Sequence, residues 1–506
     1  MEASNALVLQ YDLERFEEVR NYTNVAIADF VSAQMCRLPF SEIESQAMER
    51  GLEFTRLLIQ SHLDYRSAQE SALKQVTGAD GIERRHVRKD CERNMTTVAG
   101  EVTIKRLGYS KHGAQFLFPL DGELNLPDDK YSYGLRQRTG QEIARGSFDQ
   151  AVSIVGETTG GKVPKRQARE LTADIAQDFE AFYAIGHNPG IEETADPLIL
   201  SLDGKGIVMR QEALTEATRK AAEKEQKKKQ ARLEGKGNRK RMATVAAVYS
   251  IPRHERSAES IMCHGKESGV KRPKWRNKRV WASIERQATV VTEEVFDEAL
   301  RRDPTKSRPW AVVVDGQPQQ LKNIKSRIKQ HGLENVTLIL DFIHVLEYLW
   351  EAARGFGFKD NEAEPWVRER ALNILHGKAS DVAAGIHRSA TLRKIRAAAR
   401  KTIDKSANYF LKYTDMMRYD LYLAAGLPIA SGVIEGACRH LIKDRMDITG
   451  ARWGLKGAEA VLKLRSLKSS GDFDDYWTFY KTESYKRNHL SRYESSVIPM
   501  PLTIAA

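Results

Sequence analysis

Three short apolar runs, each ending on an aspartate, constrain the fold of this 506-residue chain most strongly. The first run, residues 198–202, leads into Asp203, and Gly204 and Gly206 follow it. It is too short for a typical helix and has the composition of a buried strand, which the two glycines are expected to end. Ligands gather at the carboxyl ends of strands in open α/β sheets, so Asp203 is predicted to face a site. An aspartate before glycine is also a common turn residue, so Asp203 alone leaves that interpretation open.

The two later runs repeat this pattern. Residues 310–314 lead into Asp315, and residues 336–340 lead into Asp341. Further segments predict a strong strand, a shorter strand and two helices, at residues 243–251, 260–263, 293–302 and 321–330. The order strand, strand, strand, helix, strand, helix, strand is that of a ribonuclease H-like α/β domain with a mixed five-stranded sheet. In that fold the first and fourth strands are neighbours, which would place Asp203 beside Asp315.

A further carboxylate follows a long helical stretch predicted over residues 343–425. Ser431 has the character of a helix N-cap, which places Glu435 in the first turn, where the helix dipole favours an ionised carboxylate. Arg439, four positions later, is expected on the same helix face. A single glutamate in such a place is usually a surface charge. The interpretation changes if Glu435 converges with the aspartates.

The charge balance indicates the class of partner. Lys and Arg number 80 against 68 Asp and Glu, a net charge of +12, which favours nucleic acid over an acidic protein surface. The four cysteines lack paired spacing, which argues against a zinc module or a disulfide framework and fits a reducing cytoplasm. Glu2 stands where a signal peptide carries a basic residue, and no apolar run approaches the roughly eighteen residues of a membrane helix. We therefore expect a cytoplasmic protein, nucleoid-associated when bound to DNA, with no membrane partner.

The N-terminal regions are expected to be non-catalytic. Residues 1–75 are predicted helical, with packing or self-association as their role, and residues 98–109 are predicted to form a hairpin strand with residues 115–118. The expected division of the chain is a helical region 1–75, a small β-hairpin region 76–131, a DNA-binding region 132–190, a catalytic domain 191–475 with a basic insertion 211–241 and a helical insertion 355–428, and a C-terminal tail 476–506.

Residues 132–185 resemble a helix-turn-helix unit in their spacing. Ser147 and Gln150 predict a capping box, residues 159–161 a turn, and Pro164 the first turn of a second helix. That helix begins with basic and amide side chains, the end that meets base edges in such motifs. The candidates are Lys165, Arg166, Gln167 and Arg169. A helical hairpin with solvated charges is the alternative interpretation.

Other candidate DNA contacts are scattered along the chain. The stretch 219–241 is too charged to bury itself, so it is either a solvated excursion or an arm along phosphates. Lys443, Arg445 and Arg452 are single charges on a predicted helical face, so each is either a phosphate contact or simply solvated. His344 is either capped by Asp341 or in contact with DNA. The candidates are Arg239, Lys240, Arg241, His344, Lys443, Arg445 and Arg452.

Several motifs together resemble the Kra group of bacterial insertion-sequence transposases. They are SLDG (201–204), RKRMATV (239–245), VDG (314–316), DFIH (341–344), GVIEG (432–436) and RMDITGARW (445–453), with FPLDGELNLP (118–127) and DFEAFY (178–183) upstream. The resemblance implies a DDE transposase on a ribonuclease H-like fold that uses divalent metal. Asp203, Asp315 and Glu435 match the expected Asp, Asp and Glu positions. Asp341 remains the alternative for the middle position.

Physical chemistry supports this assignment. Two divalent ions about 4 Å apart activate a nucleophile and stabilise the leaving oxygen of a phosphodiester. Carboxylate ligands suit Mg²⁺, with Mn²⁺ as a substitute. Water attack would free a 3′-hydroxyl at an element end, which would then attack target DNA. The expected partners are double-stranded DNA of the terminal repeats and the target, with a homodimer or higher oligomer pairing two ends.

Two alternatives stay open, and strand order separates the aspartates. The chain could instead be a DNA-binding repressor or a non-joining nuclease on the same fold. Neighbouring strands lie about 5 Å apart, and strands two places apart about 10 Å, so Asp315 is better placed than Asp341 to share a metal with Asp203. Asp341 is also expected to act as the N-cap of the helix from residue 342.

Overall fold

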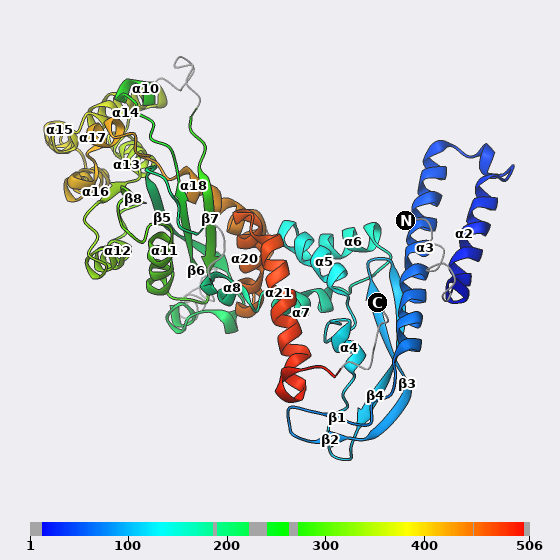
Figure 1. Ribbon diagram of the computed structural model, residues 1–506. Coiled ribbons are helices and arrows are strands. Elements are labelled where there is room, and N and C mark those ends of the chain that lie inside the picture. The colour runs from blue at the N-terminus through cyan, green and yellow to red at the C-terminus, as the bar shows by residue number, and fades with distance from the viewer. Residues whose placement is uncertain (1–12, 186–189, 222–239, 263–271, 449, 500–506) are drawn as a thin grey trace. The chain divides into compact units, whose positions relative to one another are not determined.

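The computed structural model describes residues 13–185, 190–221, 240–262, 272–448 and 450–499 (Figure 1). The chain divides into two compact units. One comprises residues 1–182 and 473–506, and the other comprises residues 183–472. Each unit is described by itself.

The first unit begins with two helices and a long β-hairpin. Helices α2 (Glu17–Phe30) and α3 (Phe40–Gln69) confirm the predicted helical region. Strand β4 (Gly100–Ser110) pairs antiparallel with β3 (His86–Thr97), and the short strands β1 (Val76–Thr77) and β2 (Glu83–Arg84) pair with each other. The predicted pairing with residues 115–118 is confirmed only as an isolated antiparallel bridge between Tyr109 and Leu117, and β3 is the main partner of β4. Leu63 of α3 packs with side chains of the hairpin and the loop after it, in a cluster with Met95, Val102, Ile104 and Leu126.

A helical group completes the first unit. It consists of α4 (Pro119–Glu123), α5 (Tyr133–Arg145), α6 (Phe148–Thr158), α7 (Lys165–Ile175) and α21 (Phe473–Asn488), with α8 (Phe179–Ile185) at the boundary between units. The capping box of Ser147 and Gln150 opens α6 as predicted, and α7 begins directly after Pro164.

The predicted C-terminal tail begins inside helix α21. The buried aromatic side chains of Tyr476 and Tyr480 attach this helix to α7. The Tyr480 hydroxyl donates to Asp174 Oδ2 at 2.6 Å, and the Tyr476 hydroxyl donates to the Ile175 carbonyl. Because these partners lie about 300 positions away in the sequence, local pattern alone did not indicate the packing.

The second unit contains a mixed five-stranded sheet. Its strands are β5 (Leu198–Val208), β6 (Lys240–Ser250), β7 (Arg276–Ser283), β8 (Trp310–Val314) and β9 (Val336–Leu340). The order is β7-β6-β5-β8-β9, with the first three strands antiparallel and β8 and β9 parallel to β5. The prediction that the first and fourth strands are neighbours is confirmed.

Two details of the predicted sheet were wrong. Strand β5 does not end at Asp203, because its pairing with β6 continues through Gly204 and Gly206 to Val208. The parallel pairing of β5 with β8 does stop earlier, at Ser201 opposite Val313. The predicted short strand around residues 260–262 is part of helix α10 (Ala258–Met262), and β7 supplies the third strand instead. The charged start of β7 hides the buried second half of that strand from a hydropathy pattern.

Helices surround the sheet and form a separate group beside it. The sheet helices are α11 (Ala288–Arg302), α12 (Pro318–Gln330), α13 (Phe342–Gly355), α18 (Gly432–Ala437), a π-helical turn (Cys438–Lys443), α19 (Asp444–Met446) and α20 (Leu455–Ser470). The group beside α13, drawn in yellow to orange in Figure 1, contains α14 (Asp360–Leu375), α15 (Ala379–Leu392), α16 (Ala397–Lys412) and α17 (Tyr419–Ala424). It confirms the helical character predicted for this part of the chain.

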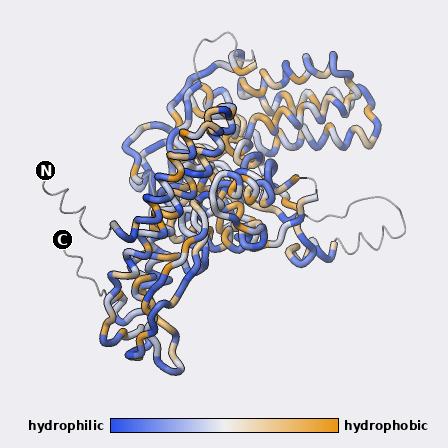
Figure 2. The backbone as a smooth tube through the Cα atoms, turned by 90° about the vertical axis from the view of Figure 1, so that its right-hand side faces the viewer, coloured by the Kyte–Doolittle hydropathy of each residue, from blue (hydrophilic) through white to orange (hydrophobic). Residues whose placement is uncertain are grey.

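Hydrophobic and hydrophilic residues are interleaved along the helices (Figure 2). Within the part of the chain that the structure describes, no helix combines the length and the apolar character needed to cross a membrane.

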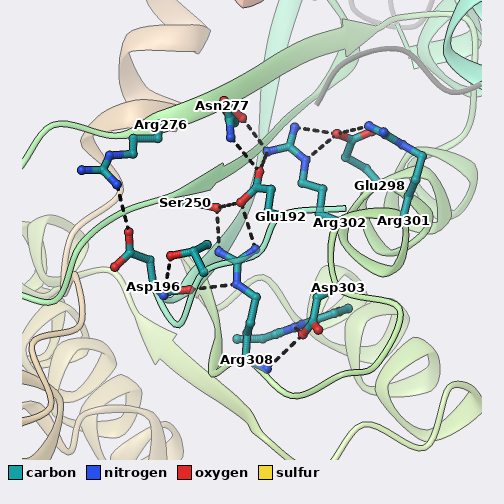
Figure 3. A network of polar contacts seen from close by, with 12 residues as sticks. Glu192, Asp196, Ser250, Arg276, Asn277, Glu298, Arg301, Arg302, Asp303 and Arg308 are labelled. Carbon is teal, nitrogen blue, oxygen red and sulfur yellow. Dashed lines mark hydrogen bonds and ion pairs between the residues drawn. The ribbon is translucent and has the colours of Figure 1, made fainter. Parts of the chain in front are cut away.

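A buried charge network closes the amino ends of β5 and β8 (Figure 3). Glu192 accepts a hydrogen bond from Arg308 at 2.9 Å and lies 3.4 Å from Arg302 Nη1. Arg302 also donates to Glu298 at 2.7 Å, and Arg308 donates to the Ser250 hydroxyl at 2.7 Å. Arg302 is fully buried and Arg308 nearly so. Every residue named here has a charged or polar partner, and the network lies at the sheet end opposite the aspartates.

Candidate active site at the carboxyl end of β8

One pocket of about 640 Å³ collects the predicted carboxylates. Asp203 comes from β5, Asp315 from the turn after β8, Asp341 from the start of α13, and Glu435 from α18. The pocket is also lined by Lys205, His344, Glu347, Cys438, Arg439, His440, Lys443 and Asp444. These residues span more than 240 positions of sequence, and the strand order brings them together.

Asp203 and Asp315 occupy equivalent places on neighbouring strands. The last parallel pair is Ser201 opposite Val313, and each aspartate lies two residues beyond it. Asp203 is half-buried, its Oδ1 accepts from the Gly204 amide at 2.6 Å, and its Oδ2 accepts from the Cys438 thiol at 3.1 Å. Strand pairing therefore places the two carboxylates at the same edge of the sheet.

Asp315 begins a tight turn. Its Oδ1 accepts from the Gln317 amide at 2.9 Å, and the residue between them, Gly316, has a φ of +86°. The backbone carbonyls of Asp315 and Gly316 accept hydrogen bonds from the hydroxyls of Tyr409 and Tyr413. The orientation of the Asp315 carboxylate is thus tied to the backbone of this turn.

Asp341 caps a helix, as predicted from the sequence. Its Oδ1 accepts from the Ile343 amide at 2.8 Å, which confirms it as the N-cap of α13. Its Oδ2 accepts from the backbone amide of Ser431 at 3.1 Å and from the Ser431 hydroxyl. Asp341 is only 3% exposed. Ser431 occupies the N-cap position of α18, but its side chain does not cap that helix, since its hydroxyl binds Asp341 instead.

Glu435 is exposed in the short helix α18, and the backbone then changes to a π-helical turn. Glu435 and Arg439 both line the pocket. The Arg439 guanidinium, however, lies 3.5 Å from Asp444, which makes Asp444 rather than Glu435 its ion-pair partner. An exposed glutamate side chain can change rotamer without disturbing the core.

The carboxylates alter the titration of their neighbours. Burial acts to lower the pKa of His344, but its hydrogen bond to Glu347 and the nearby carboxylates of Asp341 and Asp315 outweigh burial and raise the pKa. Burial raises the pKa of the Cys438 thiol, and the charge of Asp203 raises it further. Cys438 is therefore a neutral donor to Asp203.

The donor set fits a hard divalent cation by its chemistry. Carboxylate oxygens are the ligands that Mg²⁺ and Mn²⁺ prefer. Among the described residues, however, no three His, Cys, Asp or Glu side chains lie close enough together to hold one ion. The carboxylates share a pocket without meeting at one point.

The basic residues predicted at the start of α7 lie on the first unit. Lys165 forms an ion pair with Asp149 at 2.6 Å, and Arg166 forms one with Glu170 at 3.1 Å. Arg169 is exposed with its guanidinium 5.6 Å from the Phe148 ring centroid, and Gln167 is half-buried. Three of these four side chains are thus exposed at the helix start.

The remaining predicted cations have different environments. His344 and Lys443 line the pocket, and Lys240, at the start of β6, lies 3.6 Å from Asp447. Arg241 donates to the Ala213 carbonyl at 3.5 Å, Arg452 is exposed, and Arg239 lies outside the described residues.

Arg445 differs from its prediction as a phosphate contact. It is only 5% exposed, and its guanidinium lies 4.8 Å from the Trp453 ring centroid. Its guanidinium is thus buried beside an aromatic ring rather than exposed to solvent.

Sequence reasoning missed Lys205, which lines the pocket, and two tyrosines that contact the Asp315 turn from outside the pocket. Lys205 lies two positions after Asp203, and this spacing puts both side chains on one strand face. Ending the strand at Asp203 concealed that relation. Tyr409 and Tyr413, four apart on a helix, have the spacing of ordinary packing residues, so their contacts with the Asp315 turn carried no local signal.

A scan against protein-family models and a search of curated proteins found no match to this chain.

Proposed function

We propose that this chain is a DNA transposase of an insertion sequence, which binds element ends and catalyses metal-dependent DNA cleavage and strand transfer. The observation that carries the proposal is the common pocket of Asp203, Asp315 and Glu435. Each comes from a different segment: Asp203 lies in β5, and Asp315 directly follows the adjacent parallel strand β8. Carboxylates gathered at strand ends in this way are suited to holding divalent cations beside a phosphodiester.

The sheet supports a ribonuclease H-like catalytic domain. Three antiparallel strands are followed by two that run parallel to the first, in the order β7-β6-β5-β8-β9. This order and the intervening helices α11 and α12 agree with the proposed fold. The helical group α14–α17 is then an insertion before the element that carries Glu435.

We assign some pocket residues to a divalent cation and others to the DNA backbone. Asp203, Asp315 and Glu435 would hold Mg²⁺ or Mn²⁺, which when bound supplies Lewis-acid activation of the phosphodiester. Asp341 orients α13 and the Ser431 segment through its hydrogen bonds. Lys205 and Lys443 line the same pocket and place positive charge where a DNA phosphate would approach.

The other partners follow from the same proposal. The exposed basic start of α7 would bind the terminal repeats, and the net charge of +12 would favour DNA in general. Pairing two element ends calls for a homodimer or higher oligomer on DNA. The proposed working compartment is the bacterial cytoplasm.

The test uses purified full-length protein and labelled DNA carrying an end of the element that encodes it. We expect Mg²⁺-dependent cleavage that exposes a 3′-hydroxyl, followed by joined products with a target plasmid, and neither in EDTA. The variant Asp444→Asn, which alters a pocket carboxylate outside the proposed ligand set, should keep both activities. Cleavage without joined products would favour a non-joining nuclease, and binding without cleavage would favour a repressor.

A further inference from the structure

Four tyrosine hydroxyls reach the backbone at the carboxyl ends of β8 and β9. Tyr409, near the end of α16, donates to the Asp315 carbonyl at 2.7 Å, and Tyr413, just after α16, donates to the Gly316 carbonyl. Two tyrosines of α17 do the same for β9. Tyr419 donates to the Leu340 carbonyl at 2.7 Å, and the Tyr422 hydroxyl lies 3.3 Å from the Leu338 carbonyl and 3.1 Å from the Asp415 carbonyl, which share its one proton.

The α17 pair protects a sheet edge. Strand β9 is the outermost strand, and the backbone of Asn335 and Asp341 bonds toward β8. Alternate residues of a parallel strand bond to opposite sides, so the carbonyls of Leu338 and Leu340 face outward. Hydroxyl donors there satisfy carbonyls that would otherwise be open to another strand.

The α16 pair, Tyr409 and Tyr413, instead contacts the turn that carries Asp315. A Cβ added at Gly316 would lie 3.1 Å from the Tyr413 ring and 3.2 Å from the Tyr409 hydroxyl, and its φ of +86° also favours glycine. The turn and the two tyrosines are therefore closely fitted. Because Asp315 Oδ1 accepts from the Gln317 amide of the same turn, fixing the backbone also fixes the carboxylate.

The Tyr409 hydroxyl is itself held in place. Its ring stacks on Tyr348 of α13 with centroids 3.8 Å apart and an interplanar angle of 16°. The contact therefore joins α16, α13 and the Asp315 turn.

We propose that Tyr409 and Tyr413 are positioning residues that set the Asp315 carboxylate for cation binding, which makes the helical insertion a structural part of the active site. This inference rests on the proposed function, since it assigns Asp315 to a cation. It predicts that the α16 hydroxyls affect cation affinity while the α17 hydroxyls affect stability alone.

The chain offers a matched pair of variants for the test. Tyr409→Phe/Tyr413→Phe and Tyr419→Phe/Tyr422→Phe each remove two hydroxyls that donate to strand-end carbonyls and keep all four rings. Calorimetric titration of the full-length proteins with Mn²⁺ should show a dissociation constant raised about tenfold in the first variant, as expected for two lost hydrogen bonds. The second variant should stay close to wild type, although its melting temperature falls. If the first double variant does not fold, Tyr409→Phe replaces it.

A second measurement does not depend on metal. Amide exchange at Gln317 should accelerate in the α16 variant and stay unchanged in the α17 variant. Equal Mn²⁺ affinities in the two variants, or unchanged exchange at Gln317, would overturn the positioning role. Wild-type protein that binds no Mn²⁺ would overturn the proposed function, while the exchange result would still decide whether the tyrosines hold the turn.

Discussion

At the scale of single residues, three aspartates in similar sequence contexts have different surroundings. Asp341 is 3% exposed and both of its oxygens accept protein hydrogen bonds. Asp203 and Asp315 are half-buried and line the pocket from adjacent strands. This difference supports Asp315 as the middle ligand and Asp341 as a structural residue.

Replacing each aspartate by asparagine separates these roles. Asp315→Asn should abolish Mg²⁺-dependent cleavage while the melting temperature is kept or raised, because fewer carboxylates then repel one another. Asp341→Asn can still cap α13 but loses an acceptor for Ser431, which should cost about 1–3 kcal/mol of stability and leave measurable cleavage. Cleavage assays and thermal melts of both variants check this, and the reverse pattern would move the site to Asp341.

Glu70 in the first unit should make stability depend on pH. Burial raises the pKa of Glu70 to about 7, and Asp121 and Glu123 add to the shift against the opposing hydrogen bond from the Leu107 amide. The folded state then holds a proton that the unfolded state releases near pH 4.5, so stability falls as pH rises from about 4.5 through 7.

Glu70→Gln keeps an acceptor for Leu107 and removes the titration. We expect its melting temperature to exceed that of wild type by a few degrees at pH 8 and to match it near pH 4.5. Parallel melts across this range measure the difference. A difference that is independent of pH would contradict the assignment.

At the scale of elements, hydropathy patterns predicted the three strands that lead to the aspartates and the helices between them. They failed where distant contacts decide the structure. Strand β5 continues past Asp203 because β6 pairs with it through Gly204 and Gly206. Strand β7 begins with charged residues, and α21 is anchored by tyrosines to α7. Local periodicity carries no information about such partners.

Helix α7 is the element proposed to bind element ends. Lys165→Ala/Arg166→Ala should weaken binding to terminal-repeat DNA and reduce the slope of log affinity against log salt by about one to two, because each phosphate contact releases counterions. Gel shifts at several salt concentrations measure both quantities. Lys111→Ala/Lys486→Ala, which removes two other exposed lysines of the same unit, is the control. Unchanged affinity and slope in the α7 variant would exclude its role.

At the scale of the whole molecule, the two ends of the sheet in the second unit differ in the environment of their charged side chains. Asp203 in the middle of β5 and Asp315 directly after β8 present half-buried acids to a pocket, whereas the amino ends of these strands are closed by paired buried charges. Strand order predicted that Asp203 and Asp315 lie at one edge of the sheet, and both line the pocket. The sequence did not predict Lys205, because the strand was expected to end at Asp203. It also did not predict the tyrosine contacts or the buried Arg445, which depend on how distant segments pack.

The buried network should matter for stability and not for chemistry. Glu192→Gln leaves Arg302 and Arg308 without a shared anion and should cost about 3 kcal/mol, as for other broken buried ion pairs. Arg276→Ala breaks a pair with Asp196 at 3.7 Å whose arginine is 68% exposed, and should cost less than about 1 kcal/mol. Chemical denaturation checks both values. Equal costs would show that burial does not govern this network.

Cleavage of a labelled element end by Glu435→Gln tests the central claim most directly. Glutamine keeps the side-chain volume but is a neutral and weaker metal ligand. Because Glu435 is exposed, we expect unchanged melting temperature and DNA affinity, with Mg²⁺-dependent cleavage lost while wild type cleaves under the same conditions. Mg²⁺-dependent nicking retained by Glu435→Gln would contradict the assignment of Asp203, Asp315 and Glu435 to one catalytic site.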